Sequence, residues 1–155
     1  MHDEGFSDLS QLVTFSIGDE EYGVGILRVQ EIIRMMPVTK VPSCPDFVEG
    51  VINLRGMVIP VVDMRKRFEM PAKPFDVHTR ILVMESEIQV MGYIVDSVRE
   101  VMRIDPSRIE AAPTEVAGVG SEYIKGMVQN GNKLLILLDL NDLLSESEKG
   151  ALAAI

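Results

Sequence analysis

Short apolar runs separated by turn residues dominate the pattern of hydrophobic and polar positions along the chain. Each run has strand length, is rich in Val, Ile and Leu, and is bounded by Gly, Asp, Asn or Glu. Several runs are apolar throughout, which indicates strands with both faces covered. Turn signals at short intervals favour small barrels or a sandwich, so the pattern predicts an all-β fold. The predicted strands are Val13–Ile17, Tyr22–Ile26, Gly50–Leu54, Met57–Val62, Arg80–Met84, Val90–Val95, Gly126–Gln129 and Lys133–Leu138.

Helix is predicted only in short pieces. Asp63–Phe68 fits a short turn between strands. Near the C-terminus, Ser145-Glu-Ser-Glu148 has the spacing of a capping box, and the apolar Leu152 and Ile155 follow on one face. We therefore expect a short helix over residues 145–155, and a flexible tail over residues 1–11.

The chain contains an internal repeat. Residues 47–68, FVEGVINLRGMVIPVVDMRKRF, align without a gap with residues 123–144, YIKGMVQNGNKLLILLDLNDLL. Residues 22–37, YGVGILRVQEIIRMMP, align in the same way with residues 91–106, MGYIVDSVREVMRIDP. One unit is thus predicted twice: hairpin, V-x-E-[IV] segment, proline bend, hairpin.

Two lobes follow from this repeat, about 12–75 and 76–144, with exchange of strands between them left open. Half of this chain, about 70 residues, would form only a marginal core alone, so we predict that the lobes share an apolar interface. The segment Pro71-Ala-Lys-Pro-Phe-Asp76 is the predicted crossover.

The two copies differ at one hairpin turn. The alignment places Leu54 and Arg55 opposite Asn130 and Gly131, a pair that suits a tight turn because both residues accept positive φ. A large apolar residue and a guanidinium are poor turn formers but good contact groups. We predict that Leu54 and Arg55 serve recognition; the alternative is that Leu54 fills local core and Arg55 is merely solvated.

Composition and charge exclude several classes of protein. The chain has 155 residues, 46% of them hydrophobic, which suits one globular domain. With a net charge of −9 and Arg65-Lys66-Arg67 as the only dense basic cluster, nucleic acid is not an expected partner, and that cluster is predicted to be a solvated face. The apolar runs fall far short of the roughly 20 residues that span a bilayer. No secretory signal is predicted, and a single cysteine suits a reducing cytoplasm.

No catalytic or metal-binding constellation is visible in the sequence. His2 lies in the predicted tail, His78 stands alone, and Cys44 is flanked by prolines with no base nearby in sequence. Motifs of the CxxC, HExxH and phosphate-loop kinds are missing from the sequence. We predict no enzymatic activity, no metal and no cofactor. The alternative is a small all-β ligand-binding domain with a site that the sequence does not reveal.

Four segments together resemble the CheW family of chemotaxis coupling proteins: FSIGDEEYGVGILRVQEIIR, PDFVEGVINLRGMVIPVVDMRKRF, YIVDSVREV and LLILLDLNDLL. The resemblance extends from about Leu12 to Leu144, and its most specific motifs are Val29-Gln-Glu-Ile32 and Gly50-Val-Ile-Asn-Leu-Arg-Gly56. It implies two intertwined, small five-stranded β-barrels of the SH3 type, with short helices between strands.

The same resemblance implies a function without catalysis. CheW-like proteins are cytoplasmic adaptors that hold the histidine kinase CheA, through its CheW-like regulatory domain, to the hairpin tips of transmembrane chemoreceptors. The membrane would be reached only through those receptors. A narrower alternative is a CheW-like scaffold for another receptor–kinase pathway, such as surface motility or gene regulation.

Individual residues are matched to the family's motifs. The implied binding residues are Val29, Glu31, Ile32, Leu54, Arg55 and, as the second-copy counterpart of Val29, Val98; the implied turn residues are Gly50, Asn53 and Gly56. The alternative is that Val29 and Ile32 are core and Glu31 is a solvated charge. Because only the first copy has both the glutamate and the turn arginine, we further predict that Glu31 and Arg55 meet.

Overall fold

The structure, a computed structural model, describes residues 10–86, 89–111 and 124–140. The predicted C-terminal helix and most of the predicted N-terminal tail lie outside these ranges. The strands are β1 (Gln11–Ile17), β2 (Glu20–Gly25), β3 (Val29–Arg34), β4 (Val48–Leu54), β5 (Met57–Asp63), β6 (Arg80–Glu85), β7 (Val90–Val95), β8 (Ser97–Arg103), β9 (Ile124–Asn130) and β10 (Lys133–Leu138). Short helices are η2 (Ile26–Arg28), α1 (Met64–Arg67) and η3 (Pro106–Arg108). No helix in the described ranges is long and apolar enough to cross a membrane.

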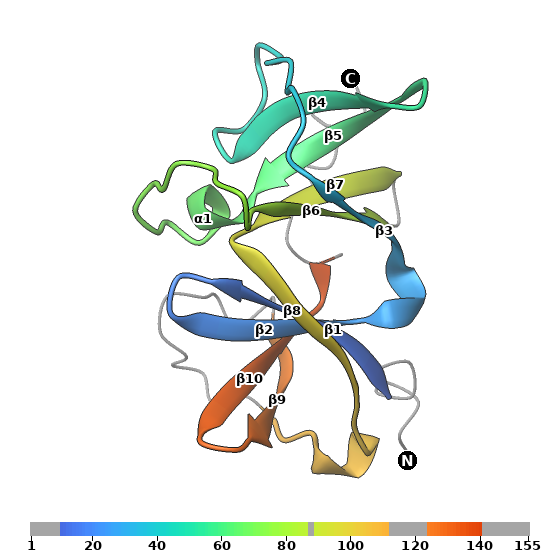
Figure 1. The fold of residues 1–155 in the computed structure, drawn as a ribbon, viewed down its shortest axis with the longest axis vertical. Coiled ribbons are helices and arrows are strands. Elements are labelled where there is room, and N and C mark those ends of the chain that lie inside the picture. Colours follow the sequence, from blue (N-terminus) through green and yellow to red (C-terminus); the bar gives the residue numbers. More distant parts are fainter. Residues whose placement is uncertain (1–9, 87–88, 112–123, 141–155) are drawn as a thin grey trace.

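The strands form two five-stranded sheets, which confirms the predicted all-β fold. The first sheet has the order β8-β1-β2-β10-β9, and the second has the order β3-β6-β7-β5-β4 (Figure 1). Most neighbours pair antiparallel, while β10 pairs with β2, and β5 with β7, in parallel. The two sheets lie one above the other in Figure 1, with α1 at the side of their junction.

The internal repeat is visible in this topology. Strands β1 to β5 of the first copy correspond to β6 to β10 of the second, and exchanging counterparts converts one strand order into the other. Each sheet combines the first hairpin of one copy with the last three strands of the other. Each half of the chain therefore contributes strands to both sheets.

The chain passes between the sheets at two places, and neither is the predicted crossover. One place is η2, between β2 and β3, and the other is Asp96, between β7 and β8. Pro71–Asp76 does join the two copies of the repeat, but the elements on both sides, β5 with α1 and β6, belong to the second sheet. The segment thus connects the two halves of the repeat as predicted, but the prediction that it crosses from one packed unit to the other is wrong.

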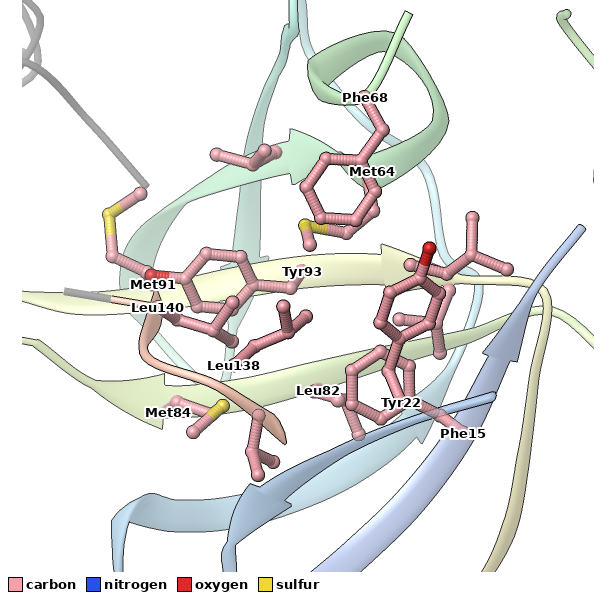
Figure 2. Packing of buried hydrophobic residues seen from close by; sticks show 14 of the residues in the cluster. Phe15, Tyr22, Met64, Phe68, Leu82, Met84, Met91, Tyr93, Leu138 and Leu140 are labelled. Carbon is pink, nitrogen blue, oxygen red and sulfur yellow. The ribbon is translucent and has the colours of Figure 1, made fainter. Parts of the chain in front are cut away.

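The apolar strands contribute side chains both to a core within one sheet and to a core shared by the two sheets. In β10, Leu135 and Leu137 belong to a cluster within the first sheet, whereas Ile136 and Leu138 belong to a larger cluster that both sheets share. Side chains from both sheets meet in this shared layer (Figure 2). The predicted shared interface is confirmed, and it explains why these strands are apolar on both faces.

Two strands were not predicted from the sequence. The V-x-E-[IV] segments of the two copies form β3 and β8, each at the edge of its sheet. Both are charged and only partly buried, with the alternating or largely exposed pattern of edge strands. Charged side chains on an edge strand weaken the apolar signal by which strands are recognised.

Replacing Tyr22 with phenylalanine is expected to raise the free energy of unfolding by about 1 kcal/mol. The ring is fully buried in the shared layer and stacks on Phe15, but its hydroxyl has no hydrogen-bond partner among the described residues. Burial, and secondarily the charge of Glu20, raises the pKa of this hydroxyl. Phenylalanine keeps the ring and removes the polar atom. Urea unfolding measures the change, and a lower midpoint would show that the hydroxyl has a partner.

Candidate functional site

The tip of the β4–β5 hairpin is a two-residue turn made by Arg55 and Gly56. Both have positive φ, 53° and 89°, as a tight hairpin turn of type I′ requires. Asn53 supports the turn, because its side-chain oxygen accepts a hydrogen bond from the Gly56 amide at 2.8 Å. The predicted central pair, Leu54 and Arg55, is thus wrong by one residue, since Leu54 is the last residue of β4.

The sister hairpin shows what this backbone prefers. At the position of Arg55, the β9–β10 turn has Gly131, with a φ of 65°. A side chain at such a φ is unfavourable because its Cβ crowds the backbone, and glycine avoids this. Arg55 therefore occupies a position where backbone geometry favours glycine, which supports a role for its guanidinium.

Arg55 and Glu31 form an ion pair, as predicted. One guanidinium nitrogen donates to a Glu31 carboxylate oxygen at 3.1 Å, and a second nitrogen donates to the other oxygen. The hydrogen bond from Arg55 lowers the pKa of Glu31, and the same bond raises the pKa of Arg55. The Arg55 side chain remains 68% exposed, so the pair holds the guanidinium in place while leaving it accessible.

This ion pair joins the two edge strands of the second sheet. Glu31 lies on β3 and Arg55 follows β4, at opposite ends of the strand order. Farther along the same edges, the amides and carbonyls of Thr39 and Val51 exchange hydrogen bonds of 2.8 Å. In the first sheet, Glu110 and Met127 make the matching bridge. The ion pair thus adds a side-chain connection to the backbone bridge that both sheets have.

Apolar residues flank the Arg55–Gly56 turn in the sequence. Leu54 is half-buried and packs against the core of the second sheet, whereas Met57 and Val58 are 53% and 58% exposed. Sequence reasoning missed Met57 and Val58 because it assigned them to a buried strand. We call residues 54–58 the apolar–cationic tip. The matching residues of the sister hairpin, 130–134, run Asn-Gly-Asn-Lys-Leu and are mostly polar.

The other predicted binding residues lie elsewhere on the two edge strands. Val29 and Val98, at or near the start of β3 and β8, are half-buried and pack against the shared layer. Ile32 is exposed on β3. Val98 also lines an open groove of about 550 Å³ between β8, the β1–β2 turn and the segment that carries Lys73 and His78.

Gly50 was predicted to be a turn residue, but it lies within β4. It sits at a break in the β4–β5 register and has a φ of 149°. A Cβ placed there would be 2.1 Å from the Thr39 carbonyl oxygen. Gly50 therefore allows the close approach of Thr39 that closes the sheet edge.

The basic cluster after β5 makes contacts within the protein. Arg65 pairs with Asp96 at 2.7 Å, Lys66 pairs with Glu49 at 2.9 Å, and the Arg67 guanidinium lies over the Phe47 ring at 4.8 Å. The prediction of a merely solvated face is wrong. These charges hold α1 in place.

Comparison with known proteins places the chain in a family. A family model described as a CheW-like domain matches residues 11–148. The chemotaxis protein CheW of Klebsiella aerogenes is 37% identical over 89% of this chain and 83% of its own length. That of Treponema pallidum is 34% identical over 99% of this chain and 90% of its own length. The crystal structure of the scaffolding protein TtCheW from Thermoanaerobacter tengcongensis superposes with a TM-score of 0.83, at 36% identity and 90% coverage of both chains. The family resemblance of the sequence motifs is confirmed, and the chain belongs to the CheW family of chemotaxis proteins.

Proposed function

We propose that this protein is a non-enzymatic adaptor that couples transmembrane chemoreceptors to the histidine kinase CheA. The observation that carries the proposal is the apolar–cationic tip. Arg55 is held by Glu31 in a conformation that its backbone disfavours, and the exposed Met57 and Val58 stand beside it. Arginine is enriched among the residues that supply most of the binding energy at protein interfaces, and methionine is enriched in the interfaces themselves.

Two partners are proposed. The first is the CheW-like regulatory domain of CheA, and the second is the cytoplasmic hairpin tip of the receptors. A receptor helix would lie in the open groove beside Val98, as in the helix-in-groove mode of recognition. The proposed contact residues are Val29, Glu31, Ile32, Leu54, Arg55 and Val98. The protein would work in the cytoplasm, at the membrane only through the receptors.

Amide shift mapping by NMR tests this proposal. The ¹⁵N-labelled chain is titrated separately with a receptor-tip fragment and with the kinase regulatory domain. We expect two distinct footprints, with the receptor fragment shifting amides around Val29 and Arg55. The chain should also co-sediment with receptor membranes and CheA without any added small molecule.

A matched control uses the sister hairpin. Lys133 is the exposed cation of that tip, so Lys133→Ala should leave both footprints and both affinities unchanged. Shifts confined to residues 145–155, or equal losses from Lys133→Ala and Arg55→Ala, would contradict the assignment of binding to the apolar–cationic tip.

A further inference from the structure

A second ion pair, Arg65–Asp96, ties together parts of both sheets. The Arg65 guanidinium donates to the two Asp96 carboxylate oxygens at 2.9 and 2.7 Å. The Gly18 amide donates to the same carboxylate at 2.8 Å, and another Arg65 nitrogen donates to the Pro71 carbonyl at 2.8 Å. The Arg65–Asp96 pair, which we call the clasp, thus connects three parts of the chain that are far apart in the sequence: the β1–β2 turn, the β7–β8 junction, and α1 with the segment that follows it.

The clasp lies where the chain passes between the two sheets. Asp96 is the residue at which the chain leaves the second sheet for the first, and Gly18 lies in the β1–β2 turn of the first sheet. Arg65 belongs to α1, which follows β5 of the second sheet. Side chains of the pair are only 18% and 14% exposed. Burial acts to raise the pKa of Asp96, but the bonds from Arg65 and Gly18 outweigh it and leave that pKa below its usual range.

The fold does not require a carboxylate at such a junction. In the repeat, the counterpart of Asp96 is Leu27, at the junction between β2 and β3. Leu27 is 76% exposed, in a short helical turn that makes this passage without a side-chain cap. The same backbone task is therefore done at the sister site without an ion pair, which argues that Asp96 has a further role.

The clasp is connected to several of the segments that line the groove beside Val98. Gly18, Asp96 and residues of β8 line the groove, and so do Lys73 and His78. Lys73 and His78 belong to the segment that begins at Pro71, whose carbonyl accepts from Arg65. The Ser16 and Ser97 hydroxyls, which also line the groove, lie 2.6 Å apart and connect β8 to β1.

We infer that Arg65 and Asp96 are positioning residues that set the width of this groove and thereby the affinity for a receptor helix. The inference rests on the proposed function, because it assigns a role to the groove that the receptor would occupy. Without the clasp, residues 71–78 would lose their connection to the β1–β2 turn and β8. Packing in the shared layer would keep the protein folded.

Paramagnetic relaxation reports on the distance across the groove, between residue 72 and the amides of Gly18 and β8. A spin label is attached at Ala72→Cys, an exposed position, in a Cys44→Ser background that removes the single native cysteine. We expect Asp96→Asn to change the relaxation of the Gly18 and Ser97–Glu100 amides and to weaken binding of the receptor-tip fragment about fivefold, as is typical for residues that act through others. Arg65→Gln should act in the same way, and it decides the question if Asp96→Asn does not fold.

Lys66→Gln is the matched control. It breaks the 2.9 Å ion pair between Lys66 and Glu49. Lys66 is on the same helix as Arg65, but its partner Glu49 lies on β4, so this pair does not connect the two sheets. It should change neither the relaxation nor the affinity. A folded Asp96→Asn protein with unchanged relaxation would overturn the inference, as would an unchanged affinity for a fragment that the wild type binds. A wild type that does not bind the fragment would contradict the proposed function instead, and the relaxation would still show whether the clasp sets the groove.

Discussion

Replacing Gly50 with alanine should lower the free energy of unfolding by about 3 kcal/mol or more, the sum expected for a strained φ and an overpacked site. The φ of 149° is one that side chains rarely adopt. A Cβ would also lie 2.1 Å from the Thr39 carbonyl oxygen and 2.8 Å from its carbon. Urea unfolding followed by circular dichroism measures the loss.

The surroundings of Gly50 cannot relax cheaply. The two nearest atoms that a Cβ would meet are backbone atoms of Thr39, and Thr39 exchanges two hydrogen bonds of 2.8 Å with Val51. Moving Thr39 would break the bridge that closes the edge of the second sheet. Gly56→Ala is the control, because Gly56 also has positive φ but a Cβ there would meet nothing within 4 Å. If both variants lost the same stability, backbone strain alone would account for Gly50.

The strands and the repeat could be predicted because several strands are buried on both faces and are therefore apolar at consecutive positions. A strand between two cores needs apolar residues on both faces, and in β6 Ile81 and Val83 face one core while Leu82 and Met84 face the other. The repeat preserves these positions. Ile52, Ile59 and Val61 have Val128, Leu135 and Leu137 as their buried counterparts.

Other features of the fold could not be predicted. A repeat shows which residues correspond, but a strand can pair with a neighbour from either copy at almost the same apolar burial. The exchange of strands between copies is therefore invisible in the apolar pattern, and only the family resemblance indicated that the two barrels are intertwined. The Pro71–Asp76 segment was misinterpreted for the same reason, since a boundary between repeats need not be a passage between sheets.

The candidate site was predicted as far as the repeat could show a difference between copies. Comparison of Arg55 with Gly131 singled out the tip, and the glutamate on β3 suggested its partner. Asp96 and Arg65 were not found as a pair, because partial burial of both charges depends on packing between α1 and the β7–β8 junction. A sequence comparison of Asp96 with Leu27 is the signal that could have drawn attention to it.

Replacing Arg55 with glycine should reduce receptor-dependent activation of CheA at least about tenfold while leaving the protein as stable as the wild type or more stable. The loss has the size expected for an interface arginine that makes a central contact. Stability should not fall, because glycine removes the strain of a side chain at a φ of 53° and the exposed ion pair with Glu31 contributes little. Phosphate incorporation into CheA in receptor membranes measures activation, and the urea midpoint measures stability.

Arg55→Ala separates the two effects of this position. Alanine removes the guanidinium but keeps a Cβ at the strained φ, so it should match glycine in lost activation and be less stable than glycine. Glu31→Gln keeps the arginine and weakens its hold, and should therefore give an intermediate loss of activation. Normal activation by a folded Arg55→Gly protein would refute the role of the guanidinium, whereas a loss that followed stability across the three variants would reduce Arg55 to a structural residue. Because glycine is expected to stabilise the fold and impair coupling at once, this position distinguishes recognition from folding more sharply than any residue of the buried cores.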